Sequence, residues 1–203
     1  ILTGNIDVKN TTGRISLLRN VFYLNNLRTN VFDGNVTGDI SMNLITSLLK
    51  IGLKGENVNV DKAMTDAANM KGMLSGNAAF ETDISLKGAT YEEQMKSLDG
   101  TVNFSVKDGQ FGPFGKLENM IIAENIRESA FFQTFLGGIV EGLFTIDTTH
   151  FSELKGTIGF KDGVCHIEPL TSLGNILSLH VFGDFDLLRN YADMKVRARM
   201  ASL

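Results

Sequence analysis

Apolar and polar side chains alternate along many short stretches of this chain. Within residues 98–111, Val102, Phe104 and Val106 alternate with polar residues, and this period of two is typical of a strand with one apolar face. The Asp108-Gly109 pair that follows favours a turn, because Gly accepts a positive φ and Asp bonds to nearby backbone. The pattern therefore predicts a strand that ends in a turn.

The same unit, a glycine-led strand closed by a turn, occurs several times. Residues 154–164 are a close copy, and reduced forms occur at 74–80 and 2–8. The cleanest alternation covers 177–187 and 194–200, which indicates a sheet with one apolar and one polar face. Five short strands joined by Gly-rich turns, one of them at Asp33-Gly34, are expected before residue 60, at 6–8, 15–18, 21–24, 31–32 and 36–42.

Helical patterns are fewer. Residues 61–70 carry an apolar stripe at helical spacing with Gly72 at the C-cap position, and Thr90 with Glu93 forms a capping-box pattern for a short helix ending near Leu98. Segment 44–49 fits either a helical turn or a buried strand. Residues 117–143 predict a longer helical region, broken near the glycines at 137–138. The fold class expected is mainly β (α+β): a curved antiparallel sheet or groove of many short strands, with two or three helices packed on it or capping it.

The composition agrees with a folded, β-rich chain. Of 203 residues, 43% are hydrophobic and 21% are charged, which is far from the composition of a disordered protein. The 21 glycines against 2 prolines fit glycine turns between strands better than a helical bundle. No linker-like stretch divides the chain, so a single domain over 1–203 is expected.

Charge and cysteine content exclude several classes of protein. The net charge is −4, and the longest cationic feature is the alternating set Lys195, Arg197 and Arg199, which is too small for a nucleic-acid footprint. A single cysteine, Cys165, excludes an internal disulfide framework. No run approaches the roughly 18 apolar residues of a membrane span. Because the chain opens inside a copy of the repeated unit, we expect a piece of a longer protein whose membrane anchor lies elsewhere.

Catalytic and metal-binding patterns are not found in the sequence. His150, His166 and His180 have no second ligand at metal-binding spacing, and a polar-face position is the better interpretation. Cys165 and His166 are adjacent on a predicted strand, so they point to opposite faces and do not pair as nucleophile and base. No phosphate-binding glycine motif is present. We therefore expect neither an enzyme nor a cofactor.

The phenylalanine-rich segment 129–143 has two interpretations. Its apolar stripe either completes an ordinary core on the sheet or lines an apolar cavity that a lipid chain could occupy. The apolar sheet faces carry the same ambiguity, since a face that helices leave uncovered is either a core awaiting a partner or a groove for hydrocarbon.

Several of these motifs, taken in order, resemble the C-terminal region of AsmA-family proteins. The motifs are the runs at 73–80 and 98–109, then Leu-Lys-Gly-Thr-Ile at 154–158, Lys-Asp-Gly at 161–163 and Gly-Asp-Phe-Asp-Leu at 183–187. The likeness covers roughly residues 38–203 and rests on glycines and apolar alternation.

The resemblance implies a role in the cell envelope of a Gram-negative bacterium. It implies a periplasmic protein tethered to the inner membrane by a segment outside this chain, and similar to the TamB-like and YhdP-like proteins. In this wider group, a long β-sheet curls into a groove that shields acyl chains between membranes and supports outer-membrane lipid homeostasis and assembly. The partners implied are phospholipid or another acyl-chain lipid, together with envelope proteins, and the family offers no catalytic residues to carry over.

Under this interpretation, the apolar strand faces supply the lining of a lipid groove. The expected lining residues are Val102, Phe104, Val106, Phe131, Phe132, Phe135, Ile158, Phe160, Leu177, Leu179, Val181 and Phe185. Lys195, Arg197 and Arg199 are weaker candidates for contact with lipid headgroups, since a solvated strand face also explains them. The alternative function is a structural module with a closed core that docks partner proteins or a neighbouring sheet.

Overall fold

The computed structural model describes residues 6–68, 71–112, 149–174 and 177–200. These residues form one sheet in which strand order follows chain order from β1 to β10, and every neighbouring pair is antiparallel. The strands are β1 (Val8–Leu18), β2 (Val21–Val31), β3 (Gly34–Asn43), β4 (Leu48–Asn59), β5 (Leu74–Lys87), β6 (Asp99–Phe111), β7 (Thr149–Lys161), β8 (Val164–Leu173), β9 (Leu177–Asp186) and β10 (Tyr191–Met200). The described helices are α1 (Val60–Ala68) and α2 (Tyr91–Ser97).

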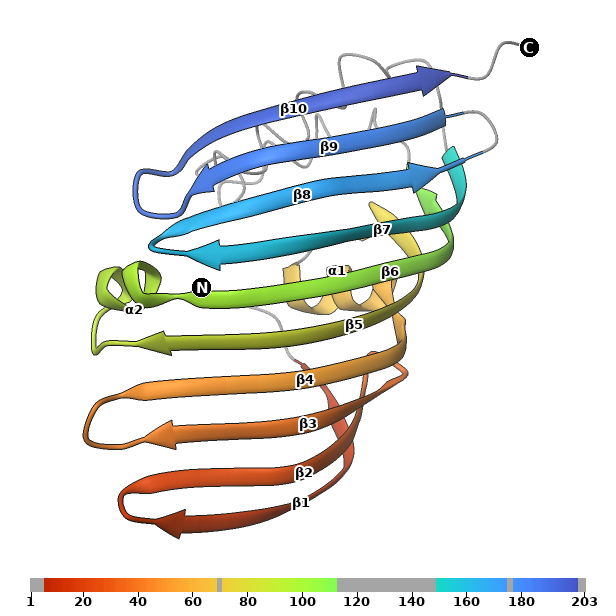
Figure 1. Cartoon of the computed structure of the whole chain (residues 1–203). Coiled ribbons are helices and arrows are strands. Elements are labelled where there is room, and N and C mark those ends of the chain that lie inside the picture. The colour runs from red at the N-terminus through yellow and green to blue at the C-terminus, as the bar shows by residue number, and fades with distance from the viewer. Residues whose placement is uncertain (1–5, 69–70, 113–148, 175–176, 201–203) are drawn as a thin grey trace.

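The sheet is twisted and curved, and α1 lies on the side toward which the strands bend (Figure 1). Helix α2 lies beyond the ends of β5 and β6, which it connects (Figure 1). The curved, mainly antiparallel architecture confirms the fold class in outline. Two helices are described, and the third predicted helical region, at 117–143, lies outside the described residues.

The prediction of many short strands is wrong, because the strands run for 10 to 14 residues. Bulges inside the strands interrupt the alternation that the sequence shows. In β2, Asn26 has a φ of 54° at the point where the register with β3 shifts. The strand expected at 21–24 and Val31 of the strand expected at 31–32 therefore belong to one strand, whereas Phe32 lies in the turn that follows.

The two copies of the Asp-Gly motif adopt different structures. At Asp162-Gly163 both residues have positive φ and form the turn between β7 and β8. Asp108 also has a positive φ, of 50°, but β6 continues through it to Phe111, and the register with β5 shifts at this point while the register with β7 is kept. The turn expected at Asp108-Gly109 is therefore a bulge within a strand.

The turn between β2 and β3 is present, one residue earlier than expected. Phe32 and Asp33 both have positive φ, which is the two-residue type I′ geometry that matches strand twist. The ambiguous segment 44–49 is a turn followed by the start of β4.

Both predicted short helices are present, and the predicted C-cap at Gly72 stays a prediction because residues 69–70 lie outside the described ranges. Helix α1 begins after Asn59, whose side-chain oxygen accepts a hydrogen bond from the Lys62 N–H at 3.0 Å. At α2, the Thr90 hydroxyl accepts from the Glu93 N–H, and the Glu93 carboxylate accepts from the Thr90 N–H. This reciprocal pair is the capping box that the sequence predicts.

Candidate functional site

One face of the sheet carries apolar side chains that stand in register across all ten strands. In one row, each residue is the Cα partner of the next, from the first strand to the last. Since neighbouring strands lie about 4.8 Å apart, such a row forms a continuous track perpendicular to the strands. The row is Ile15, Leu24, Ile40, Ile51, Ile84, Gly100, Phe160, Cys165, Phe185 and Ala192; we call it the apolar row.

A second row runs parallel to the apolar row from β2 to β10. It crosses the same face two residues further along most strands, so the apolar surface is wider than one side chain. The only side-chain hydroxyl in this row belongs to Thr82, and its oxygen is buried without a hydrogen-bond partner. The second row is Leu27, Gly38, Leu53, Thr82, Val102, Ile158, Ile167, Gly183 and Met194.

The structure gathers the described candidate lining residues on this one face. Of the eight candidates whose side chains are described, two belong to the apolar row and two to the second row. The other four pair with residues of neighbouring strands on the same face. Phe131, Phe132 and Phe135 lie outside the described residues, and of Leu177 only the backbone position is described, opposite Met200. The eight are Val102, Phe104, Val106, Ile158, Phe160, Leu179, Val181 and Phe185.

Sequence reasoning missed the half of this face that β1 to β5 contribute. Ile40, Ile51 and Ile84 lie directly in the apolar row, although none was singled out as a lining residue. The signal was present, since Leu49, Ile51 and Leu53 alternate with lysine or glycine. Register, which pattern alone does not give, was needed to join these strands to the others.

Exposure differs between the two ends of the apolar face, although Leu27 in β2 and Val36 in β3 are also buried. At β1, the side chain of Ile15 is 68% exposed, and in β3 to β5 the members of the row are half-buried. At β9, Val181 is fully buried at 0% and Phe185 is 7% exposed. The apolar face is therefore open toward β1 and filled toward β9.

Helix α1 covers part of this face near the middle of the sheet. Val60 and Met64 pack against Val106 of β6 and Leu154 of β7. Phe151 joins the same cluster, and its ring centroid lies 4.8 Å from that of Phe111. The ends of β6 and β7 near α1 are thus closed by side chains.

A hollow of about 670 Å³ spans β4 to β8 at the level of Phe80 and Phe104. Its rim includes charges of both signs, among them Lys54, Glu81 and Glu168. A mixed rim of this kind does not select a ligand of one charge.

The cationic candidates lie on the opposite, polar face of the sheet. Lys195, Arg197 and Arg199 are exposed and alternate along β10 with residues of the apolar face. The Arg197 guanidinium lies 5.3 Å from the centroid of the Phe182 ring, a cation–π contact. A headgroup contact through these residues would be made from the polar face and not from within the apolar concavity.

The histidine and cysteine residues lie as the strand pattern predicts. Cys165 is buried on the apolar face, and burial, aided by the negative charge of Asp184, raises the pKa of its thiol to about 11. His166 lies on the exposed face, where its Nδ1 is 2.7 Å from Oδ1 of Asp184. This cross-strand pair was missed because its members are 18 residues apart in sequence.

Other chemistry is sparse among the described residues. His180 Nδ1 lies 3.4 Å from the Thr171 hydroxyl, and His150 is exposed. Nowhere in the described ranges do three or more His, Cys, Asp or Glu side chains gather in a way that could hold a metal ion. No helix in these ranges is long and apolar enough to cross a bilayer.

Comparison with known proteins identifies a family. No curated protein and no solved structure gave a match to this chain. The model of the AsmA family matches residues 4–170, well over half of the chain. The chain therefore belongs to the AsmA family, which is associated with assembly of the bacterial envelope and with lipid transport.

Proposed function

We propose that the apolar face binds acyl chains of phospholipid and lets them pass along the sheet between the inner and outer membranes. In this role the protein is non-enzymatic and supports lipid homeostasis and assembly of the outer membrane. The observation that carries the proposal is the unbroken apolar row from Ile15 in β1 to Ala192 in β10.

The dimensions of the row suit this role. Nine inter-strand steps of about 4.8 Å give a track of roughly 43 Å, whereas one leaflet of a bilayer core is about 15 Å thick. More than one acyl chain could therefore lie along the row. Each methylene removed from water contributes about 0.8 kcal/mol, so apolar contact alone is enough to hold a chain.

The side chains of the apolar row would also let an acyl chain move along it. Its members are aliphatic, aromatic or glycine, apart from the Cys165 thiol, which its raised pKa keeps neutral at physiological pH. No charged group interrupts the track, so a chain that slides along it exchanges one apolar contact for another. The open end near β1 is the place where an acyl chain would first reach the face, since Ile15 and Leu17 are exposed there.

The family membership supports the cellular setting. We place the protein in the periplasm of a Gram-negative bacterium, tethered to the inner membrane by a segment outside this chain, with envelope proteins as possible further partners. No cofactor or catalytic step is part of the proposal, because Cys165 and His166 face opposite sides of the sheet.

A matched pair of variants in β6 tests the proposal. Val102 belongs to the second row, and its neighbour Thr101 is exposed on the polar face. The protein would be purified gently from a bacterial host, and bound lipid would be measured by native mass spectrometry and lipid extraction. We expect phospholipid to co-purify with the wild type and with Thr101→Asp, and to be lost from Val102→Asp.

Folding is checked separately by circular dichroism, and Ile51→Asp with Lys50→Asp provides a second matched pair in β4. Lipid-free wild-type protein that also fails to bind fluorescent fatty acids would overturn the proposal. That outcome would favour the alternative, a structural module that docks partner proteins.

A further inference from the structure

Two neighbouring hairpin turns present large aliphatic side chains to solvent. The turn between β1 and β2 follows Leu18, which is 62% exposed, and the turn between β3 and β4 contains Leu44 and Ile45, which are 54% and 74% exposed. The Leu44 N–H donates to the Asn20 carbonyl at 2.8 Å, so the turns lie side by side, at the same end of the sheet (Figure 1). We call residues 18–20 and 44–45 the hairpin corner.

The backbone geometry of both turns keeps these aliphatic side chains exposed. Arg19 and Asn20 have positive φ of 48° and 63°, the geometry of a tight two-residue turn. In the second turn, the Asn43 side-chain oxygen accepts hydrogen bonds from the N–H groups of Ile45 and Thr46, both at 3.0 Å. These bonds hold Leu44 and Ile45 at the tip instead of letting the segment fold over the core.

The two strands that form the first turn of the corner carry positive charges and no negative ones. Residues 8–32, which form β1, β2 and their turn, contain Lys9, Arg14, Arg19 and Arg28, whereas all 23 acidic residues of the chain lie elsewhere. The nearest acidic residues in the sequence are Asp7, which pairs with Lys9 at 3.0 Å, and Asp33, which pairs with Lys62 at 2.9 Å; Asp39 accepts a hydrogen bond from the Asn26 N–H.

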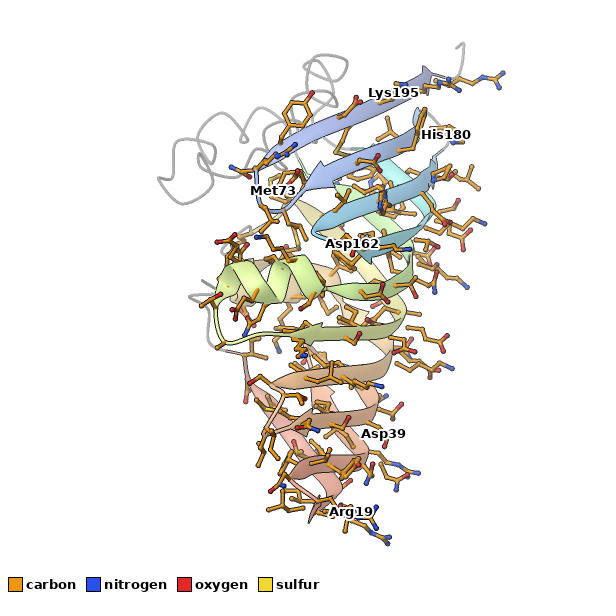
Figure 2. The ribbon with its side chains drawn as sticks, turned by 60° about the vertical axis from the view of Figure 1, so that its left-hand side comes forward. Arg19, Asp39, Met73, Asp162, His180 and Lys195 are labelled. Atoms are coloured by element: carbon orange, nitrogen blue, oxygen red, sulfur yellow. The ribbon has the colours of Figure 1, made fainter. Side chains whose placement is uncertain are left out.

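At the tip itself the charge is cationic. Figure 2 shows the Arg19 side chain extending away from the end of the sheet. Lys50 is exposed two residues into β4, close to the second turn. The cations of residues 8–32 are spread along the β1–β2 edge, whereas the rest of the chain has a net charge of −8, so an anionic surface attracts this edge and meets Arg19 and Lys50 at the corner.

We propose that the hairpin corner docks on the surface of a bilayer that contains anionic phospholipid. Leu18, Leu44 and Ile45 enter the interfacial layer, where exposed aliphatic groups leave water, and Arg19 lies against the headgroup phosphates. The inference goes beyond the proposed function and does not rest on it, because docking requires no acyl chain on the sheet.

The chain contains no tryptophan, so a single introduced tryptophan reports on one place. Ile45→Trp puts the probe at the corner. Tyr191→Trp puts a matched probe at an exposed position, 64% accessible, near the opposite edge of the sheet. With vesicles of phosphatidylglycerol and phosphatidylcholine, we expect a blue shift and quenching by brominated lipid for Ile45→Trp and neither for Tyr191→Trp.

Charge reversal supplies the second test, in the Ile45→Trp background. Arg19→Glu should weaken vesicle binding by about tenfold or more, because each cation near an anionic surface contributes about a factor of five. Arg189→Glu makes the same change at an exposed arginine in the turn between β9 and β10 and should alter binding by less than about twofold. Leu44→Ser, which removes an apolar contact without changing charge, should also weaken binding.

Other outcomes overturn the docking proposal. No shift for Ile45→Trp would show that the corner does not meet a bilayer, which would leave a protein partner as its occupant. Equal shifts for both probes, or equal effects of the two charge reversals, would show that binding is not through the corner. Val102→Asp should leave vesicle docking intact, so the failure of lipid binding on the sheet and the failure of docking are distinguishable.

Discussion

Gly38 in β3 faces the carbonyl oxygen of Gly52 in β4 so closely that a Cβ at position 38 would collide with it. Gly38 has a φ of 151°, a conformation that other residues rarely adopt. Gly52, by contrast, has open space on its own side, the nearest atom to an added Cβ being the Asp39 carbonyl oxygen at 4.0 Å. The two glycines thus have different reasons to be present.

Gly38→Ala should therefore destabilise the sheet, whereas Gly52→Ala should not. We expect the free energy of unfolding to fall by at least about 2 kcal/mol for Gly38→Ala, from backbone strain and displacement of β4. For Gly52→Ala we expect a change within about 1 kcal/mol. Urea denaturation followed by circular dichroism measures both, and equal effects would contradict the assignment of strain to position 38.

The capping box at α2 should contribute measurably to stability. The Thr90 hydroxyl accepts from the Glu93 N–H at 3.2 Å, and Thr90→Ala removes this bond at the helix N-terminus. We expect a loss of about 1 kcal/mol in the free energy of unfolding, the usual value for an N-cap. Thr90→Ser keeps the hydroxyl, so it should retain most of the stability, and an equal loss in both variants would argue against the cap.

Glu93 should make this region sensitive to acid. Hydrogen bonds from the N–H groups of Ala89 and then Thr90 lower the pKa of Glu93 below its ordinary value of 4.5. A lowered folded-state pKa means that the carboxylate contributes stability above 4.5, and that this contribution is lost as the pH falls through the lowered pKa. Glu93→Gln should therefore show a shallower loss of unfolding free energy than the wild type between about pH 5 and pH 2.

Cys165 should be unreactive in the folded protein and should weaken the fold at high pH. Its pKa is raised from 9.0 to about 11, so the folded state keeps the proton that the unfolded state loses. The stability is fully present below pH 9.0 and declines as the pH rises toward about 11. Cys165→Ala should lack this decline, and fast reaction of native Cys165 with a disulfide reagent at pH 8 would contradict its burial.

The sequence predicted strand faces well where alternation is uninterrupted. Val102, Phe104 and Val106 lie on one face, as do Leu179 and Val181, because a period of two fixes facing directly. The prediction of a turn at Asp108-Gly109 was wrong, because a residue with positive φ occurs in hairpin turns and in bulges alike. The difference lies in whether the partner strand continues, and β7 does continue beside β6 to Thr149.

The apolar row could not be predicted because it depends on register between strands. Bulges shift the register between β2 and β3, between β4 and β5 and between β7 and β8. Each shift changes which residues of the two strands are opposite each other. Only the assembled sheet therefore shows that Ile51 and Phe160 belong to the same row. The His166–Asp184 pair was missed for the same reason.

Two leucines on the apolar face provide a test of its open end. Leu179 in β9 is 2% exposed, whereas Leu17 in β1 is 66% exposed. Leu179→Ala should lower the free energy of unfolding by about 2 to 5 kcal/mol, because it leaves a cavity in a packed core. Leu17→Ala should change it by less than about 0.5 kcal/mol, because the side chain already meets water.

The comparison is informative because the substitution is chemically identical at the two sites. Chemical denaturation at several protein concentrations gives both values and shows whether they depend on association. A large loss for Leu17→Ala that grows with protein concentration would mean that another copy covers β1 in solution, and the open end would then be an interface between copies. A small, concentration-independent loss leaves the apolar row accessible from β1, which is the condition that acyl-chain binding requires.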